Sequence, residues 1–514
     1  MTQTSIAYEL VKDRRRDTTI VLLLFALAAS LRLFRLNYWD PLPDEISYAL
    51  TASRLVTGRT LFSTDITFFP PLFVYLAALL QTLGIEMLLS VRLVSALFGS
   101  LLIPLIYLIL RVTNARLDSF TVTTSAAFLF VPALYSRLGQ VEVPLLFFLL
   151  LSALLLISGV IRERRHLFFL SGISLGLALW IKEIALGGLA SNLLFLLLLR
   201  PIRWRWIITL CIGWLTAATP LFVLGAITGN NLLFEISPAR GFDINMESLS
   251  LPASVVTIAA NTVLNLFARV FSDGELLMFA AAGSTFTLTA LWTVIQHFSK
   301  GDALARYLLC YAIVHIPFFV IFSRKFFYYL LPAALLLFIT AAVCSLRELR
   351  RHRRGLGLVT LLLAGLTVAF NIYSSYYLYF NRGNHQTFAK SLTRIPSGDT
   401  LLTSHPDLLK YLVHRYRFNL TVLPLFSPGS YEIDSIRCTD PTVSAVILKA
   451  SYYERLTARS PATWVWLRQV YPYSHTEIDP DWSLIPDKHC PRGLGRLAAR
   501  LTRPIGTVIL TRQP

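Results

Sequence analysis

The sequence predicts a polytopic α-helical membrane protein with about 11 transmembrane helices, juxtamembrane helices in its first external loop and a small C-terminal external α/β domain. Composition is the first observation: 55% of the 514 residues are hydrophobic and only 15% are charged. The mean hydropathy of +0.60 is the second, because a soluble domain of this length would not reach it. The third is that the basic residues, which give a net charge of +18, gather in short clusters between apolar runs. Cytoplasmic loops show this pattern, so membrane topology explains the charge better than a nucleic-acid partner.

Apolar runs that could cross a bilayer recur along the first 380 residues. A helix needs about 20 such residues, or fewer where flanking side chains reach the headgroups. The runs lie at 18–36, 88–110, 119–135, 143–160, 167–181, 184–199, 206–225, 276–295, 307–322, 327–346 and 356–380. Arg14, Arg15 and Arg16 precede the first run, and no small-residue cleavage site follows it. We therefore expect an uncleaved first span with a cytoplasmic N-terminus.

Loop charge predicts the side on which each loop lies. Basic clusters such as 162–166 and 347–354 face the cytoplasm, which makes the loop at 37–87 external. Because the number of spans is odd, the tail is external too. The sequence thus predicts a transmembrane domain at 1–380 and an external soluble α/β domain at 381–514. The protein is expected in the cell (plasma) membrane.

Two further apolar segments are not counted as spans. Residues 70–84 begin with a Pro-Pro pair and are short, which suits a juxtamembrane helix at the outer surface. Residues 252–271 are expected to form an amphipathic helix at the interface, although they are long enough to span the membrane instead.

The tail has the alternation of a small α/β domain. Strand-like runs occur at Thr400–Thr403, Val443–Leu448 and Thr507–Leu510, with a helical stretch near Pro406–Arg415. Cys438 and Cys490 also lie in the tail, where an external compartment would permit them to pair in a disulfide or leave them apart.

The first external loop places adjacent carboxylates, Asp44 and Glu45, against the membrane surface. A carboxylate at a bilayer interface costs free energy unless it has a partner or a function, so this pair is a candidate active site. The structural alternative is an interfacial loop whose acids simply stay in water. The predicted topology brings further ionisable residues to the same face, namely Arg137, Glu142, Lys182, Arg324 and Lys325.

This mixture of groups suits transfer from a lipid phosphate. Cations would hold the anionic leaving group while a carboxylate deprotonates an incoming hydroxyl. Arg324 and Lys325 oppose the positive-inside bias, and they bind either that phosphate or lipid headgroups. Tyr328 and Tyr329 would stack on sugar or belong to the interfacial aromatic belt. The absence of a glycine-rich phosphate loop in a strand-to-helix setting agrees with a lipid-linked donor.

A transporter or lipid flippase is the main alternative from another functional class. Such a protein should show internal repeats or paired broken helices near the middle of the membrane. No repeat relates the two halves of this chain, and its acidic pair lies in a long external loop. A non-catalytic scaffold that binds partners through its tail is a third possibility.

Several short motifs occur in a fixed order along the membrane part. They are Pro43-Asp44-Glu45 with Tyr48 and Gly58, Pro70-Pro71-Leu72 with Tyr75, Arg92-Leu93 with Ser95-Ala96-Leu97, Ser136-Arg137 with Glu142 and Pro144, Gly172, Gly176, Lys182, and Tyr329-Leu330-Leu331-Pro332. With these motifs the chain resembles the phospholipid-carrier-dependent glycosyltransferases of the glycosyltransferase-C superfamily, which include protein O-mannosyltransferases and lipid A aminoarabinose transferases. The resemblance is clearest over residues 30–185 and covers the tail much less.

The resemblance implies an enzyme that moves a hexosyl or pentosyl group from a polyprenyl-phosphate donor to a hydroxyl acceptor on the outer face, with inversion. Asp44 would be the catalytic base, and Glu45 would position it or bind sugar. The acceptor would be a protein, lipid or glycan, and no nucleic acid is expected. Neither the sugar nor the acceptor can be chosen from the sequence.

The remaining site residues follow from the same resemblance and topology. Donor-phosphate candidates are Arg137, Lys182, Arg324 and Lys325, and substrate-binding candidates are Tyr48, Arg54, Glu142, Tyr328 and Tyr329. In the aminoarabinose transferases a Glu-Lys pair precedes the Pro-Pro pair, with its lysine near the carrier phosphate. Phe68 and Phe69 stand there in this chain, so another cation must take that role. No cofactor is expected, and a divalent metal, if one is used, would bind to Asp44 and Glu142.

Overall fold

The computed structural model describes most of the first 228 residues and separate segments beyond them. The described residues are 3–37, 43–58, 71–113, 116–199, 201–228, 290–298, 302–321, 331–350, 358–366, 368–369, 397–403, 419–425, 438–440, 442–449, 461–478 and 506–511, with a few single positions. The chain forms two compact units. One comprises Met1–Leu36 and Thr51–Tyr379, and the other comprises Asn37–Leu50 and Phe380–Pro514.

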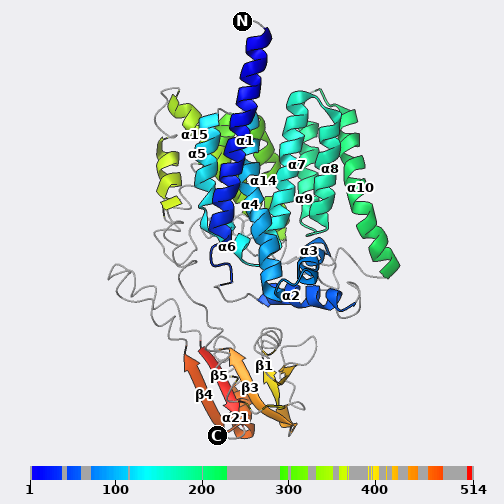
Figure 1. The fold of residues 1–514 in the computed structure, drawn as a ribbon, viewed down its shortest axis with the longest axis vertical. Helices are drawn as coiled ribbons and strands as arrows, with labels where there is room; N and C mark the ends of the chain where they lie inside the picture. The colour runs from blue at the N-terminus through cyan, green and yellow to red at the C-terminus, as the bar shows by residue number, and fades with distance from the viewer. Residues whose placement is uncertain are drawn as a thin grey trace, which may run out of the picture. The chain divides into compact units, whose positions relative to one another are not determined.

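The first unit is a bundle of helices that run up and down beside one another (Figure 1). The helices with assigned bounds are α1 Gln3–Leu33, α2 Pro43–Val56, α3 Pro71–Thr82, α4 Met87–Thr113, α5 Arg116–Ala127, α6 Phe130–Arg137, α7 Glu142–Arg162, α8 Arg165–Leu179, α9 Ala185–Leu198, α10 Trp204–Thr228, α14 Ala303–Ile321 and α15 Leu331–Arg350. The unit boundary falls within α2, whose first eight residues group with the tail.

Within the described part of the chain, three helices are long and apolar enough to cross a membrane. They are Met87–Val112, Glu142–Arg162 and Trp204–Ile227, and shorter apolar helices accompany them. The protein is therefore an integral membrane protein, while the expected number of about 11 spans stays a prediction because 229–289 lies outside the described residues. With 12 residues, α3 is about 18 Å long, which is short of the bilayer core and agrees with a juxtamembrane helix. The segment 252–271 lies outside the described residues.

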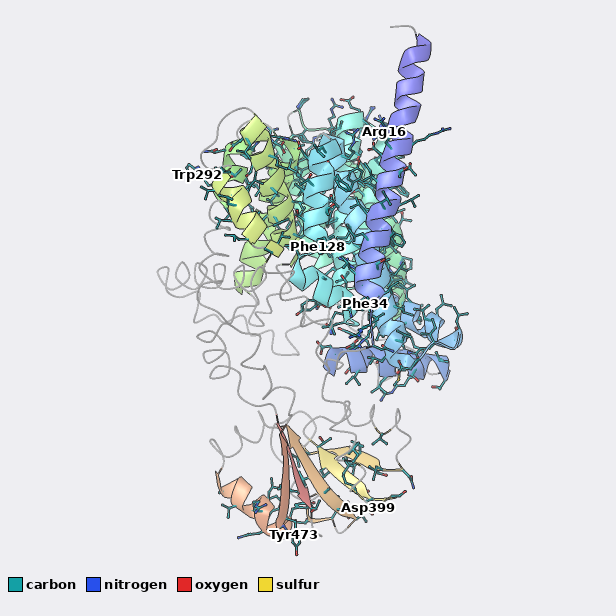
Figure 2. The ribbon with its side chains drawn as sticks, turned by 60° about the vertical axis from the view of Figure 1, so that its left-hand side comes forward. Arg16, Phe34, Phe128, Trp292, Asp399 and Tyr473 are labelled. Atoms are coloured by element: carbon teal, nitrogen blue, oxygen red, sulfur yellow. The ribbon has the colours of Figure 1, made fainter. Side chains whose placement is uncertain are left out.

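The apolar run at 119–135, expected to be one span, is two helices. At the break between α5 and α6, the amide of Phe128 donates to Ser125 O and that of Leu129 donates to Ala126 O, both at 3.2 Å. These three-residue spacings tighten the last turn of α5 and end it. Phe128 marks the break in Figure 2, where Arg16 lies within α1 and Phe34 directly follows its last residue.

The helices α8 and α10 pack most closely where glycines replace side chains. A Cβ on Gly172 would overlap the carbonyl oxygen of Leu210, and a Cβ on Gly213 would overlap that of Phe169. Small residues allow this approach of two backbones in lipid, where no hydrophobic effect drives helices together.

A buried polar cluster joins α7, α8, α9 and α14 inside the bundle. Asn192 Nδ2 donates to Ser152 Oγ at 2.8 Å, and Tyr307 Oη donates to Asn192 Oδ1 at 2.9 Å. Ser171 Oγ lies 2.8 Å from Ser152 Oγ. Hydrogen bonds between helices satisfy polar groups that lipid cannot.

Tyr307 contacts Asn192, whereas His315, later in α14, lies against Gly187, earlier in α9. The two helices are therefore antiparallel, and Asp302 lies at the end of the bundle away from Lys182. We call the end with Leu33, Glu142 and Lys182 the Glu142 end, and the end with Arg111 and Asp302 the Asp302 end. At the Asp302 end, the Asp302 carboxylate accepts hydrogen bonds from the amides of Leu304 and Ala305, both at 3.0 Å, and so caps α14.

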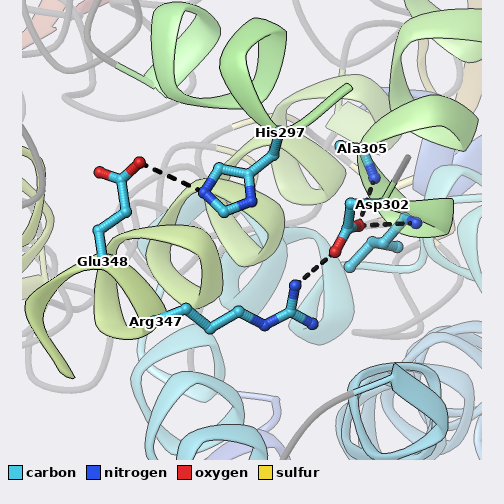
Figure 3. Close-up of polar contacts among 6 residues, drawn as sticks. His297, Asp302, Ala305, Arg347 and Glu348 are labelled. Atoms are coloured by element: carbon cyan, nitrogen blue, oxygen red, sulfur yellow. Dashed lines mark hydrogen bonds and ion pairs between the residues drawn. The ribbon is translucent and has the colours of Figure 1, made fainter. Parts of the chain in front are cut away.

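Ion pairs tie helices together at the Asp302 end (Figure 3). The Arg347 guanidinium of α15 contacts the Asp302 carboxylate. His297 Nε2, from the helical residues 290–298, lies 3.4 Å from Glu348 Oε1 of α15. Between α1 and α4, Arg111 Nε lies 3.3 Å from Asp17 Oδ1, which also accepts a hydrogen bond from Tyr107 Oη at 2.6 Å.

The described tail contains a five-stranded mixed sheet in the order β2-β1-β3-β5-β4, with helix α21 beside it (Figure 1). The elements are β1 Thr400–Thr403, β2 Thr421–Pro424, β3 Val443–Lys449, α21 Pro461–Val470, β4 Tyr473–Ile478 and β5 Gly506–Thr511. β1 pairs in parallel with β2 and β3, whereas β5 is antiparallel to β3 and β4. Leu402, Val446 and Leu510 meet in its core, where Leu467 and Tyr471 cover them.

The three strands expected in the tail are present with nearly the expected bounds. The structure adds β2, β4 and α21, whereas the helical stretch at 406–415 lies outside the described residues. β2 has only four residues and β4 reads YSHTEI, so neither offered an apolar run to recognise.

Candidate active site

The acidic pair occupies the first turn of α2. Pro43 suits the first helical position because its missing N–H would have no intrahelical partner there. Asp44 and Glu45 suit the next two positions because the N-terminal end of a helix carries positive partial charge. The sequence therefore places both carboxylates at a helix start, where acidic residues are common.

The two carboxylates have different environments. Successive helical residues point about 100° apart, so they cannot share one face. Glu45, Tyr48 and Ala49 follow the helical period and are buried, whereas Asp44 is exposed. The exposed position of Asp44 suits a base, and the buried position of Glu45 suits a positioning role. Arg54 lies half-buried in the last turn of the same helix.

A buried ion pair stands at the Glu142 end of the first unit. Glu142 opens α7, and Lys182 lies in the turn between α8 and α9. Lys182 Nζ is 3.0 Å from Glu142 Oε1, with only 11% and 5% of the two side chains exposed. Glu142 Oε2 is buried and has no hydrogen-bond partner in the described part of the chain. Because desolvation offsets much of the attraction in such a pair, its presence points to function more than to stability.

The turn that carries Lys182 is held by two neighbouring helices. The amide of Leu72 in α3 donates to Trp180 O at 3.2 Å, and Trp180 Nε1 donates to Ala217 O in α10 at 2.8 Å. The segment that follows Pro70 is thereby fixed beside Lys182. These contacts explain why a turn can hold an ammonium group in a defined place.

Arg137 faces the end of α1. Its Nη1 donates to the carbonyls of Leu31 and Arg32, and its Nη2 donates to that of Arg35, all at 3.0 Å. The last carbonyls of a helix carry negative partial charge and need donors, which a guanidinium supplies. This arrangement gives Arg137 a role at α1 and weakens the hypothesis that it binds the donor phosphate.

Arg92 is a residue to which the sequence assigned no role. It lies in the second turn of α4, is fully buried, and donates from Nη1 to the carbonyl of Leu36 at 2.9 Å. An arginine inside an apolar run costs free energy in lipid unless it faces protein. The position of Arg92 in such a run was therefore the signal in the sequence that could have identified it.

Several candidates cannot be placed. Arg324, Lys325, Tyr328, Tyr329 and Cys490 lie outside the described residues. Cys438 is buried in the core of the tail sheet. Because Cys490 lies outside the described residues, both alternatives for the two cysteines, a disulfide or two separate thiols, stay predictions.

Comparisons with known proteins agree on one architecture. Residues 69–227 match the family described as dolichyl-phosphate-mannose-protein mannosyltransferase. The structure of ArnT from Cupriavidus metallidurans in the apo state superposes with a TM-score of 0.55 at 13% identity, covering 99% of this chain and 98% of that one. The chain has the glycosyltransferase-C fold.

Two further structures share this glycosyltransferase-C fold. ArnT from the same organism bound to undecaprenyl phosphate gives a TM-score of 0.52 at 14% identity, over 96% of this chain and 97% of that one. An Archaeoglobus fulgidus oligosaccharyltransferase in complex with Zn and sulfate gives 0.53 at 14% identity, over 90% and 72%. No curated protein matches the chain by sequence.

The family match divides the candidate site. Arg92, Arg137, Glu142 and Lys182 lie inside residues 69–227, whereas the acidic pair at the start of α2 precedes them. The shared fold thus covers all of these residues, but the family match covers Arg92, Arg137, Glu142 and Lys182 and leaves out the acidic pair.

A metal site at Glu142 does not fit the residues around it. One carboxylate oxygen already holds the Lys182 ammonium, which would repel a second cation. Among the described residues, no group of three His, Cys, Asp or Glu side chains could hold an ion. We derive no chemical step through a metal.

Proposed function

We propose that this protein is a membrane glycosyltransferase that moves a sugar from a polyprenyl-phosphate-linked donor to a hydroxyl acceptor, with inversion. The observation that carries this proposal is the glycosyltransferase-C fold shared with ArnT over 99% of the chain. An ArnT structure with the same fold binds undecaprenyl phosphate. The match over 69–227 to dolichyl-phosphate-mannose-protein mannosyltransferases supports a donor of the same chemical class.

In the proposed reaction, the exposed Asp44 carboxylate takes the proton of the acceptor hydroxyl. The acceptor oxygen then forms a bond to the anomeric carbon as the bond from that carbon to the phosphate oxygen breaks. The electron pair of the broken bond leaves with the polyprenyl phosphate. Attack from the side opposite the leaving group inverts the anomeric configuration.

The other residues would bind the two substrates. Lys182, Arg324 and Lys325 are the proposed phosphate ligands, because an ammonium or guanidinium stabilises the charge that develops on the leaving group. Lys182 would do so while paired with Glu142, since an ammonium has three N–H donors. Glu45 would position Asp44 or bind sugar, and Tyr48, Arg54, Glu142, Tyr328 and Tyr329 are proposed to contact the substrates.

We place the reaction on the outer face of the membrane, with the N-terminus inside and the tail outside. This orientation rests on the basic clusters, such as 347–354, that favour the cytoplasm. In a cysteine-free background, Ser248→Cys should react with a membrane-impermeant thiol reagent on intact cells. Labelling of His352→Cys instead would reverse the orientation.

The test of the function is sugar transfer in proteoliposomes with a panel of radiolabelled polyprenyl-phosphate sugars and hydroxyl acceptors. Asp44→Asn should fold normally and lower the transfer rate by about 1,000-fold, because an amide cannot take the proton. Asp399→Asn, which makes the same change beside β1 in the tail, is the matched control and should transfer normally. Full turnover in Asp44→Asn would remove this residue as the base. A wild-type protein that moves the intact lipid across the bilayer without transferring sugar would favour the transporter.

A further inference from the structure

We propose that Arg92 and Arg137 are positioning residues that fix the end of α1 and thereby set where the chain leaves toward Asp44. The inference rests on the proposed function for its catalytic meaning, because it assigns to these arginines an effect on Asp44. The geometry of the clamp itself lies entirely within the first unit. It consists of the two arginines and the carbonyls at the end of α1.

The end of α1 and the residues just after it are held at four carbonyls, those of Leu31, Arg32, Arg35 and Leu36. Arg137 spans one turn, from the carbonyls of Leu31 and Arg32 to that of Arg35, with three bonds of 3.0 Å. Arg92 takes the next carbonyl, that of Leu36, at 2.9 Å. The last turn of a helix usually leaves these oxygens to water. Here two different helices supply charged donors to them.

The backbone at this point has an uncommon conformation. Arg35 has a φ of 52°, in the left-handed region that residues other than glycine rarely adopt. Such a conformation ends a helix sharply, and it persists only when its surroundings enforce it. The bond from Arg137 to the carbonyl of Arg35 acts on that same residue. The direction in which the chain leaves α1 is therefore fixed on both sides of the bend.

The arginines are too buried for a lipid-anchoring role. Arg92 is fully buried and Arg137 is 3% exposed. Burying a guanidinium costs free energy, and an outward-facing helix end could have been satisfied by water without that cost. Only seven residues lie between Leu36 and Asp44 in the sequence, so we expect a displacement at the end of α1 to alter the position of the base.

Arg111 provides a matched control on the same pair of helices. It joins α4 to α1 as Arg92 does, but at the Asp302 end and through the Asp17 side chain. Loss of Arg111 tests the packing of α1 on α4 without touching the end of α1 near Leu36.

The experiment compares Arg92→Lys, Arg137→Lys and Arg111→Lys in nanodiscs. Lysine keeps the charge, but its single ammonium cannot span the carbonyls that the planar guanidinium bridges. We would make three measurements: transfer kinetics (kcat and donor KM), equilibrium binding of undecaprenyl phosphate without sugar, and hydrogen exchange of peptides covering 31–50. Rates would be expressed per folded molecule.

The proposal expects Arg137→Lys to lower kcat by about 10- to 100-fold, because small displacements of a reacting group have effects of this size. Undecaprenyl phosphate binding should stay within about twofold of wild type, and exchange over 31–50 should become faster. Arg92→Lys should show the same pattern with a smaller change, because Arg92 holds one of the four carbonyls and Arg137 holds three. Arg111→Lys should leave kcat and exchange over 31–50 unchanged.

Other outcomes would overturn the proposal. Loss of undecaprenyl phosphate binding in Arg137→Lys, with normal exchange, would make Arg137 a phosphate ligand instead. An equal loss of kcat in Arg111→Lys, or failure of both clamp variants to fold, would assign the arginines to bundle stability. If the wild type transfers no sugar, the proposed function fails, but the exchange data still decide whether the clamp holds the 31–50 segment.

Discussion

The two ends of the helix bundle use ionisable residues differently. At the Asp302 end, charges pair with other side chains: Asp302 with Arg347, and His297 with Glu348. At the Glu142 end, Arg137 donates to backbone carbonyls, and Glu142 keeps one buried oxygen without a partner among the described residues. At both ends the contacts join different helices of the bundle.

This difference suggests that the charges at the Asp302 end hold helices together, whereas the carboxylate at the Glu142 end is available for chemistry. A carboxylate that caps a helix and pairs with an arginine has its acceptor capacity taken up. A carboxylate with an unused oxygen beside a lysine can still accept a proton or a substrate hydroxyl. Mutations at the two ends should therefore have similar effects on stability but different effects on transfer.

The largest effect is expected from Glu142→Ala. Removal of one partner leaves the Lys182 ammonium in a buried position, which should cost about 3 kcal/mol of stability. Transfer per folded molecule should also fall by about 100-fold, because a positioned charged group is lost from the site. Thermal unfolding in detergent and the transfer assay measure the two effects. A stability loss with normal transfer would make this end purely structural and remove the contrast.

A smaller effect, on stability alone, is expected from Asp302→Ala. The change removes the cap of α14 and the ion pair with Arg347, which is part-exposed and so contributes little. Together they should cost about 2 kcal/mol. Transfer per folded molecule should equal that of wild type. A tenfold loss of transfer per folded molecule in Asp302→Ala would mean that the Asp302 end takes part in turnover.

The smallest effect is expected from Glu163→Gln. Glu163 Oε1 lies 2.8 Å from Arg203 Nη1, but the two side chains are 62% and 43% exposed. Water and salt screen such a pair, so its loss should change stability by less than about 0.5 kcal/mol and leave transfer unchanged. The melting temperature at low and high salt is the measurement. A large fall in the melting temperature of Glu163→Gln would show that exposed ion pairs also stabilise this bundle.

Much of the local placement of the candidate residues could be predicted because it depends on local patterns. Asp44 and Glu45 follow a proline at the start of an amphipathic helix, and the apolar runs place Glu142 and Lys182 at the same end of neighbouring helices. Three of the tail strands were recognisable as apolar runs. In contrast, β2 and β4 depend on neighbours in the sheet rather than on their own composition.

The sequence by itself determined the membrane class, the order of the helices and the residues that could carry the chemistry, because hydropathy and charge act locally along the chain. Only the tertiary structure decided what each charge contacts. The sequence made Arg137 a donor-phosphate candidate, and the structure shows that its guanidinium holds carbonyls at the end of α1. Arg92 received no role, although it holds the carbonyl of Leu36. The Arg92–Leu36 contact joins residues that are 56 positions apart, and the Arg137–Arg35 contact joins residues that are 102 positions apart. Such contacts depend on how helices pack, which no local pattern records.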